Sequence, residues 1–255
     1  MAVLTRTPLQ GLRNVVRFNW PFYAGAGAAG LGLAALALAG PTALRPFALA
    51  LLVLALLPVL GSLLATAYVY DFAGLYRFDW LPATLPPTAR VLTISAGFDE
   101  VSAPLAARYG PGRVQAADFY HPARHTEPSI GRARRAYPPY PGTLAVDTRQ
   151  LLPLPTGSVQ LAVAFLAAHE MRDPAERVAF FRELARVLAS GGQLVVTEHL
   201  RDPANFLAYS LGFLHFHSRR AWHDTFAAAG LRIEREVANS PLITTFILRR
   251  HGYAA

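Results

Sequence analysis

The chain has 255 residues, of which 53% are hydrophobic and 16% are charged, and its formal net charge is +8. It contains no cysteine, and all 24 of its Lys or Arg positions are arginine, which excludes disulfides, thiolate metal sites, P-loops and lysine Schiff bases. The positive charge fits nucleic acid or an anionic membrane, but no basic helix, RNP-like aromatic pattern or zinc module accompanies it, so we expect a membrane and no nucleic acid.

Two long apolar stretches dominate the first 70 residues. Residues 22–39 carry no charge and are long enough to cross roughly 30 Å of hydrocarbon as a helix. Residues 46–70 are longer and richer in leucine. Because Gly40 and Pro41 lie in the short connection, we expect the two stretches to form an antiparallel transmembrane hairpin.

Charge predicts how this hairpin is oriented. Three arginines precede the first stretch, whereas the short turn holds only Arg45. By the positive-inside rule both ends lie in the cytoplasm, which predicts a multi-pass protein of the inner (cytoplasmic) membrane whose C-terminal part faces the cytoplasm. We also expect the small residues of the first helix to let the second pack closely; they are Gly25, Gly27, Gly30 and Gly32.

Two other interpretations of the hairpin remain open. The first stretch could be a cleaved signal peptide, but it starts late and a second span follows at once. Both stretches could instead be a buried core hairpin, because alanine and glycine are weak insertion signals. We favour a domain organisation with a cytoplasmic N-terminal segment (1–19), the hairpin (20–70), a juxtamembrane linker (71–89) and a soluble domain (90–255).

The soluble domain alternates between strands and helices. Short β-branched or apolar runs at residues 91–95, 113–118, 144–147, 160–166 and 193–199 predict strands. Helical patterns lie between them, at residues 101–109 and 174–188. Repeated units of this kind predict an α/β fold with a doubly wound, mostly parallel sheet, whose ligand chemistry lies at the carboxyl ends of the strands.

The helix at residues 174–188 carries the most specific sequence. The run DPAERVAFFRELARVLASGGQLVVTEH resembles the ELxRVLxPGGxL pattern of class I S-adenosylmethionine (SAM) methyltransferases of type 11, with Ser190 in place of the usual proline. The other segments follow in the order of that family. The resemblance implies a Rossmann-like fold with a seven-stranded sheet, and SAM as the cofactor.

Acids at strand ends are candidates for binding this cofactor. SAM offers a ribose diol, an adenine and an amino-acid tail, and Asp118, at the end of a strand, is placed for the diol. By resemblance, Asp147 and Thr148 lie near the adenine amine, and Phe165 is assigned to the same cofactor site. Each acid could instead cap a loop or a helix.

The first loop departs from the family pattern. The family usually has an acid and three glycines here, whereas this chain has Thr93, Ser95 and Asp99 at the first, second and last of these positions and keeps only Gly97. The lost glycines could block the cofactor. We favour a variant loop in which Ser95, Ala96, Gly97 and Asp99 still bind SAM, with Asp99 or Glu100 contacting its amino group.

His169 follows the fourth strand, where many relatives carry a similar histidine, and it is the candidate catalytic residue. It could act as a general base while the methyl group arrives. The alternative is a histidine that shapes its loop, because many methyl transfers need little beyond alignment of the reactants.

Three further histidines and an acid suggest a metal site at first sight: Glu198, His199, His215 and His217. Their surroundings are apolar and aromatic, so we expect no metal and interpret residues 205–216 as a lipophilic substrate wall or membrane-facing flap. Tyr209, His215 and His217 are the candidate substrate-binding residues.

The basic, proline-rich residues 121–140 form a long insertion. They could contact anionic headgroups or an anionic substrate, or remain a solvated loop.

The sequence thus favours a membrane-tethered SAM-dependent methyltransferase of the EC 2.1.1 class, with the lipid bilayer as partner and a lipophilic, membrane-associated acceptor. Its oligomeric state is not predicted. A non-catalytic SAM or S-adenosylhomocysteine (SAH) sensor or scaffold is the alternative, suggested by the altered loop. A nucleotide-binding oxidoreductase is disfavoured by the missing GxGxxG.

Overall fold

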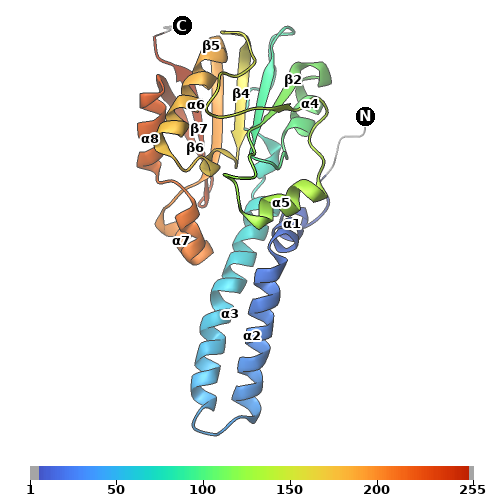
Figure 1. The fold of residues 1–255 in the computed structure, drawn as a ribbon, viewed down its shortest axis with the longest axis vertical. Coiled ribbons are helices and arrows are strands. Elements are labelled where there is room, and N and C mark those ends of the chain that lie inside the picture. Colours follow the sequence, from blue (N-terminus) through green and yellow to red (C-terminus); the bar gives the residue numbers. More distant parts are fainter. Residues whose placement is uncertain (1–5, 253–255) are drawn as a thin grey trace.

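One seven-stranded sheet, in the order β3-β2-β1-β4-β5-β7-β6, organises the C-terminal part of the chain in the computed structural model, which describes residues 6–252. Strands β1 to β5 are parallel to one another, and β7 is antiparallel to both β5 and β6. This is the expected Rossmann-like, doubly wound sheet (Figure 1). The strands are β1 (Val91–Ser95), β2 (Val114–Asp118), β3 (Leu144–Ala145), β4 (Val159–Phe165), β5 (Leu188–His199), β6 (Leu231–Ser240) and β7 (Ile243–Arg250).

Apolar side chains alternate between the two faces of the sheet and form two cores. On β1, Leu92 and Ile94 belong to the core that α6 and α8 cover, whereas Val91 belongs to the core beneath α4. Side chains of successive strand residues point to opposite faces, so a sheet covered on both sides needs such continuous apolar runs. The helices concerned are α4 (Ser102–Tyr109), α6 (Pro174–Val187) and α8 (Arg219–Ala228).

Helix α6 begins where the sequence predicts. Asp173 accepts hydrogen bonds from the backbone N–H groups of Ala175 (2.7 Å) and Glu176 (3.1 Å), and Pro174 occupies the first turn, as is typical of a helix start. The helix ends one residue earlier than expected, because Leu188 already has extended backbone angles and begins β5.

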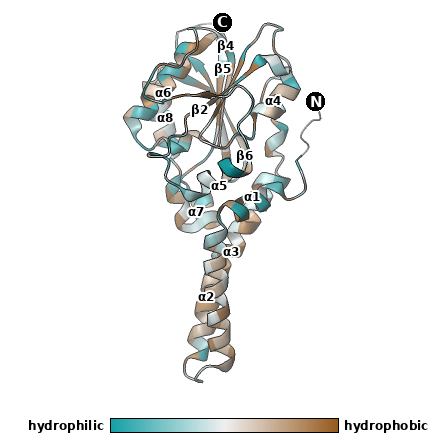
Figure 2. Ribbon diagram, turned by 45° about the vertical axis from the view of Figure 1, so that its right-hand side comes forward, coloured by the Kyte–Doolittle hydropathy of each residue, from teal (hydrophilic) through white to brown (hydrophobic). Residues whose placement is uncertain are grey.

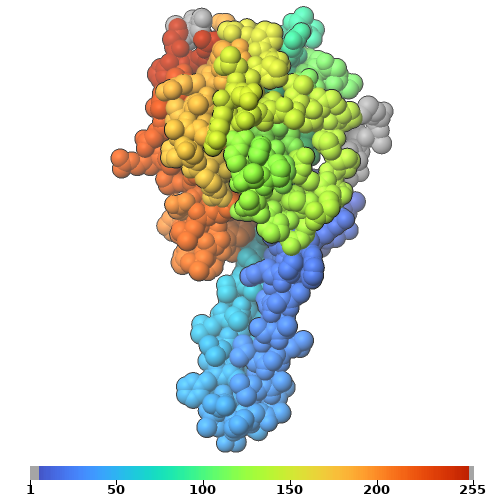
Figure 3. Space-filling view, viewed as in Figure 1, coloured from blue at the N-terminus to red at the C-terminus, as the bar shows by residue number. Residues whose placement is uncertain are grey.

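Two long helices, α2 (Trp20–Ala39) and α3 (Arg45–Ala67), form the expected hairpin and project from the α/β domain (Figure 1). Both are apolar along most of their length (Figure 2), and they stand clear of the rest of the molecule in the space-filling view (Figure 3). Within residues 6–252 they are the two helices long and apolar enough to cross a membrane. Their exposure argues against a buried core hairpin.

The glycines of α2 do not pack as predicted. Gly30 faces α3, where an added Cβ would lie 3.7 Å from Leu52, but the same atom on Gly25, Gly27 or Gly32 would meet open space. Of these four glycines, Gly30 is therefore the one that lies at the contact between α2 and α3. The other three lie on outward-facing positions of α2.

An additional helix, α1 (Gln10–Phe18), lies at the base of the hairpin, in the segment expected to be a simple N-terminal extension. Asp71 caps it from a distant part of the chain, accepting hydrogen bonds from the backbone N–H groups of Gly11 (2.8 Å) and Leu12 (2.9 Å). A Cβ on Gly11 would lie 2.3 Å from the Cβ of Tyr70, so this close contact requires glycine.

The insertion at residues 121–140 is partly helical and docks on α1. It contains α5 (Pro128–Ala136), where Arg132 donates to the carbonyl oxygen of Phe18 (2.5 Å). Just after α5, the hydroxyl of Tyr137 donates to Asn14 (2.8 Å). These contacts are with protein groups, so the part of the insertion around α5 is not a solvated loop. Arg135 of α5 is exposed, and contact with headgroups stays a prediction.

The linker expected at residues 71–89 also packs on the domain. Leu75, Phe78 and Leu81 are buried in the core beneath α4, and Arg108 of α4 donates to the carbonyl oxygen of Phe78 (3.0 Å). The hairpin is therefore joined to the α/β domain through a packed segment.

Candidate active site

A cavity of about 540 Å³ lies at the carboxyl ends of β1 and β4, where the strand order reverses. In doubly wound sheets this reversal is the usual place for a ligand. One wall comes from the sheet edge, where Ala96 and Phe165, both predicted cofactor residues, line the cavity. The opposite wall comes from the base of the hairpin and includes Asn14, Phe18, Phe22, Tyr23, Ser62, Thr66 and Tyr70.

The altered loop after β1 is built around Gly97 and Asp99. Gly97 has φ +93°, a left-handed conformation that favours glycine, and an added Cβ would lie 2.9 Å from Ile130 of α5. Oδ1 of Asp99 accepts the backbone N–H groups of Val101 and Ser102, both at 3.0 Å. Asp99 therefore caps the start of α4, and the loop holds its shape without the family's other glycines.

Asp118, at the end of β2, adjoins this loop. Its Oδ1 accepts the backbone N–H groups of Gly97 (2.7 Å) and Tyr120 (3.0 Å), and its Oδ2 pairs with Arg134 of α5. Ser95, Gly97, Asp99 and Asp118 line a small pocket of about 40 Å³ that Arg134 and residues 137–139 close. Four of the predicted cofactor residues thus share one site, beneath α5.

Asp147 and Thr148 lie in a separate polar network after β3. Arg124 binds Asp147 (2.9 Å), Thr148 (3.1 Å) and Glu176 of α6 (2.8 Å). The backbone N–H of Arg149 and this guanidinium lower the pKa of the Asp147 carboxyl. Their role in binding adenine stays a prediction, since their present partners are protein groups.

His169 is held by Glu198, a fully buried acid near the end of β5. Oε1 of Glu198 accepts the backbone N–H groups of Ala167 (3.1 Å), Ala168 (2.8 Å) and His169 (3.2 Å), and Oε2 accepts Nδ1–H of His169 (2.6 Å). One carboxylate therefore fixes both the turn after β4 and the orientation of the imidazole.

The same contacts set the protonation of His169. Burial alone would lower its pKa, but the carboxylates of Glu198 and Glu170 outweigh burial and raise the pKa to about 10. A general base must be unprotonated before it accepts a proton. Of the two roles that the sequence leaves open for His169, the geometry consequently favours the histidine that shapes its loop over the general base.

The predicted substrate residues separate into two groups. Tyr209 and His215 line the large cavity. His217 does not line this cavity: its Nε2 lies 3.1 Å from the guanidinium of Arg177 and 3.2 Å from the carbonyl oxygen of Met171. Burial and this guanidinium lower the pKa of His217 to about 3. His217 thus contributes to packing, and its predicted contact with substrate has no geometric support.

His199 lines the cavity as a neutral residue. Burial lowers the pKa of His199 to about 4. Its Nε2 is 2.9 Å from the hydroxyl of Tyr70, and its ring stacks on that of Phe216, with the ring centroids 4.7 Å apart. Its other nitrogen faces Asn205 (2.9 Å), so both nitrogens have protein partners. Binding a metal through His199 would require one of these contacts to break.

Two acids of the site, Glu198 and Glu100, bind partners that were not predicted from the sequence. The role of Glu198 was detectable, since a carboxylate in an otherwise apolar buried strand needs partners nearby. Glu100 also lines the cavity, where it binds Arg6 (3.0 Å) and the hydroxyl of Tyr76 (2.8 Å). Burial outweighs Arg6 and raises the pKa of the Glu100 carboxyl. No local pattern links Arg6 to Glu100, because they are far apart in sequence.

Comparison with known proteins agrees with the fold and identifies the domain. Residues 92–196 match the family model described as a methyltransferase domain, whereas no curated protein matches the chain. Among solved structures, geranyl diphosphate C-methyltransferase from Streptomyces coelicolor A3(2) is similar with a TM-score of 0.50 at 14% identity, over 73% of this chain and 80% of that one. A SAM-dependent methyltransferase from Mesorhizobium loti aligns at 21% identity, over 69% and 98% of the two chains, with a TM-score of 0.45.

The polar groups after β1 and β2 fit SAM. Within residues 6–252, Oδ2 of Asp99 is buried and has no hydrogen-bond partner, which suits a cationic amino group. A carboxylate has about four acceptor positions, and the contacts to Gly97, Tyr120 and Arg134 leave Asp118 able to accept a ribose hydroxyl. Together with the family-model match and the fold, these residues identify residues 92–196 as part of a class I SAM-dependent methyltransferase domain.

Proposed function

We propose that this protein is tethered to a membrane by the α2–α3 hairpin and methylates a lipophilic acceptor bound in the 540 Å³ cavity. One observation carries the proposal: a single cavity is lined both by the methyltransferase edge, through Ala96 and Phe165, and by the hairpin, through Phe22 and Thr66. An acceptor that moves from the bilayer along the hairpin would reach the cofactor edge without crossing water.

The surface of the hairpin supports a membrane location. Its large apolar side chains are exposed, among them Leu31 (75% exposed), Leu38 (80%) and Leu64 (72%). A water-soluble protein rarely exposes so large an apolar area. The arginines before the first span favour a cytoplasmic α/β domain.

Bound SAM supplies an electrophilic methyl group. The residues of this chain align the acceptor and exclude water, and such positioning provides much of the rate enhancement in reactions of this kind. Aromatic residues make most of the enclosure near the transfer edge: Phe98, Phe165, Tyr209 and Phe216 line the cavity. His169, held by Glu198, would present its charged ring to the acceptor rather than remove a proton.

Filling the hairpin side of the cavity tests the proposal. Ser62 lines the cavity, whereas a side chain on its neighbour Gly61 would meet open space. We expect Ser62→Trp to block the transfer of labelled methyl from SAM to acceptors in a membrane lipid extract, with SAH affinity unchanged, and Gly61→Trp to leave both unchanged. Equal activity of both variants would place the acceptor elsewhere.

A non-catalytic SAM or SAH sensor is a second candidate, supported by the closed pocket at Asp118. That pocket is about 40 Å³, whereas ligand pockets usually exceed roughly 300 Å³, so α5 must move before adenosine binds. SAH binding that displaces α5, with no methyl transfer to any lipid extract, would favour the sensor.

A further inference from the structure

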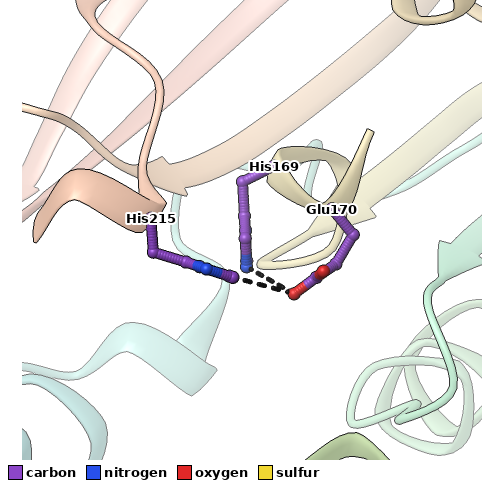
Figure 4. A group of neighbouring side chains, drawn as sticks. All are labelled: His169, Glu170 and His215. Carbon is purple, nitrogen blue, oxygen red and sulfur yellow. Dashed lines mark hydrogen bonds and ion pairs between the residues drawn. The ribbon is translucent and has the colours of Figure 1, made fainter. Parts of the chain in front are cut away.

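Three side chains converge at one side of the large cavity. Nε2 of His169 is 3.3 Å from Oε1 of Glu170, and Nε2 of His215 is 3.1 Å from the same oxygen (Figure 4). One ligand atom from each residue lies within 4.8 Å of the others, and all three residues line the cavity. His169 and Glu170 come from the turn η4 (Ala168–Glu170), and His215 ends η5 (Ser210–His215).

The distances between these ligand atoms are close to the distances between neighbouring ligand atoms around a tetrahedral metal ion. Zn²⁺ binds imidazole nitrogen and carboxylate oxygen at about 2.0–2.2 Å, so two ligands of a tetrahedral site lie roughly 3.3–3.5 Å apart. Two histidines and one carboxylate, with a fourth position open to a cavity, are the donor set of several catalytic zinc sites. Here the open position would face the space in which the acceptor binds.

The second interaction of His169 also fits a metal ligand. Its Nδ1 donates to Glu198 at 2.6 Å, which leaves Nε2 directed toward Glu170. A metal-binding histidine almost always donates its other N–H to a carboxylate, a carbonyl or water, and this contact fixes the tautomer and the ring. Glu198 therefore preorganises the nitrogen that would bind the ion, and the ion would take the place of the proton that Nε2 of the charged ring carries.

The local charge favours a dication. Glu127 lies 2.9 Å from Nδ1 of His215, so Glu127, Glu170 and Glu198 give three carboxylates around the two imidazoles. Once the ion has replaced the Nε2 proton of His169, the guanidinium of Arg172, 2.8 Å from Nε2 of His215, is the cation that still opposes these carboxylates. Arg172 is the competitor that an incoming ion must displace.

We propose that His169, Glu170 and His215 bind a divalent first-row transition metal ion, with Zn²⁺ as the test ion, on the acceptor side of the methyl-transfer cavity. This site differs from a site at Glu198 and the three histidines 199, 215 and 217, where no metal is expected from the sequence. His199 and His217 have other partners, and the third ligand is Glu170. The role of the ion rests on the proposed function: it would polarise an oxygen of the bound acceptor.

Calorimetric titration of Zn²⁺ into metal-stripped full-length protein tests the site without SAM or acceptor. We expect one ion per chain, at least about tenfold weaker binding in His215→Ala and in the near-isosteric Glu170→Gln, and tighter binding in Arg172→Leu. His223→Ala is the matched control, since His223 pairs with Glu236 (2.6 Å) outside this cluster; its affinity should equal that of the unmodified chain. Mg²⁺ should bind far more weakly, because it prefers all-oxygen sites.

Equal Zn²⁺ affinity in His215→Ala, Glu170→Gln and the unmodified chain would overturn the proposal, as would no stoichiometric binding. SAH titration and melting temperature, measured on the same variants, show that each is folded. Lipid methylation in the unmodified chain reports on the proposed function separately, so failure of the metal site and failure of the methyltransferase proposal give different results.

Discussion

Glu198→Gln is the substitution whose effect follows most directly from the structure. The amide retains an oxygen for the N–H groups of Ala167, Ala168 and His169, but it replaces the carboxylate oxygen that accepts Nδ1–H of His169. The pKa of His169 is raised from 6.5 to about 10, against burial, by Glu198 and Glu170. Losing the first of these two carboxylates should cost on the order of 2–4 kcal/mol of unfolding free energy, as for other buried charged pairs.

This cost should depend on pH in a defined direction. Because the folded pKa of His169 is raised, the stabilisation is fully present below the unfolded pKa of about 6.5 and is lost as pH rises through about 10. We therefore expect the difference in melting temperature between Glu198→Gln and the unmodified chain to be largest near pH 6, on the order of 5–10 °C, and to shrink by pH 10. Intrinsic tryptophan fluorescence of detergent-purified protein measures it. A difference that is constant across this range would refute the assigned charge pair.

Three further substitutions test other parts of the site. Gly97→Ala should weaken SAH binding at least tenfold, because the left-handed backbone and the 2.9 Å approach to Ile130 leave no room for Cβ; unchanged affinity by calorimetry would place SAM elsewhere. Arg134→Leu should strengthen SAH binding by freeing Oδ2 of Asp118, whereas weaker binding would mean that Arg134 itself contacts the cofactor. Asp71→Ala should remove the cap of α1, at about 1 kcal/mol, and speed tryptic cleavage after Arg13; an unchanged cleavage rate would contradict the capping role.

The sheet and its helices were predictable because their information is local. Apolar runs mark β1, β4 and β5, and Asp173 with Pro174 marks the start of α6. Helices α1 and α5 were not predicted, since distant residues stabilise both. Asp71 caps α1, and Tyr137, just after α5, binds Asn14. Many residues of strand β6 are exposed and charged, so its sequence lacks the apolar run that predicts a strand.

The site was predictable where chain order alone places a residue at the edge of the sheet. Ser95 and Asp118 end β1 and β2, Gly97 and Asp99 follow β1, and the four line one pocket, as the family resemblance implies. The pairing of Arg134 with Asp118, and of Glu198 with His169, depends on how distant segments pack. The His169, Glu170 and His215 cluster was hidden for the same reason, because η5 brings His215 to η4 only in the folded protein.

The most direct test of a bilayer-supplied acceptor compares two arrangements of the same components. Full-length protein is reconstituted in vesicles, and labelled SAM is added from outside, with the acceptor lipid extract present either in the same vesicles or in separate ones. We expect methylation of acceptors in the shared membrane and little in separate vesicles, since the cavity joins the transfer edge to the hairpin. Equal methylation in both arrangements, or preference for a water-soluble acceptor, would contradict delivery through the membrane.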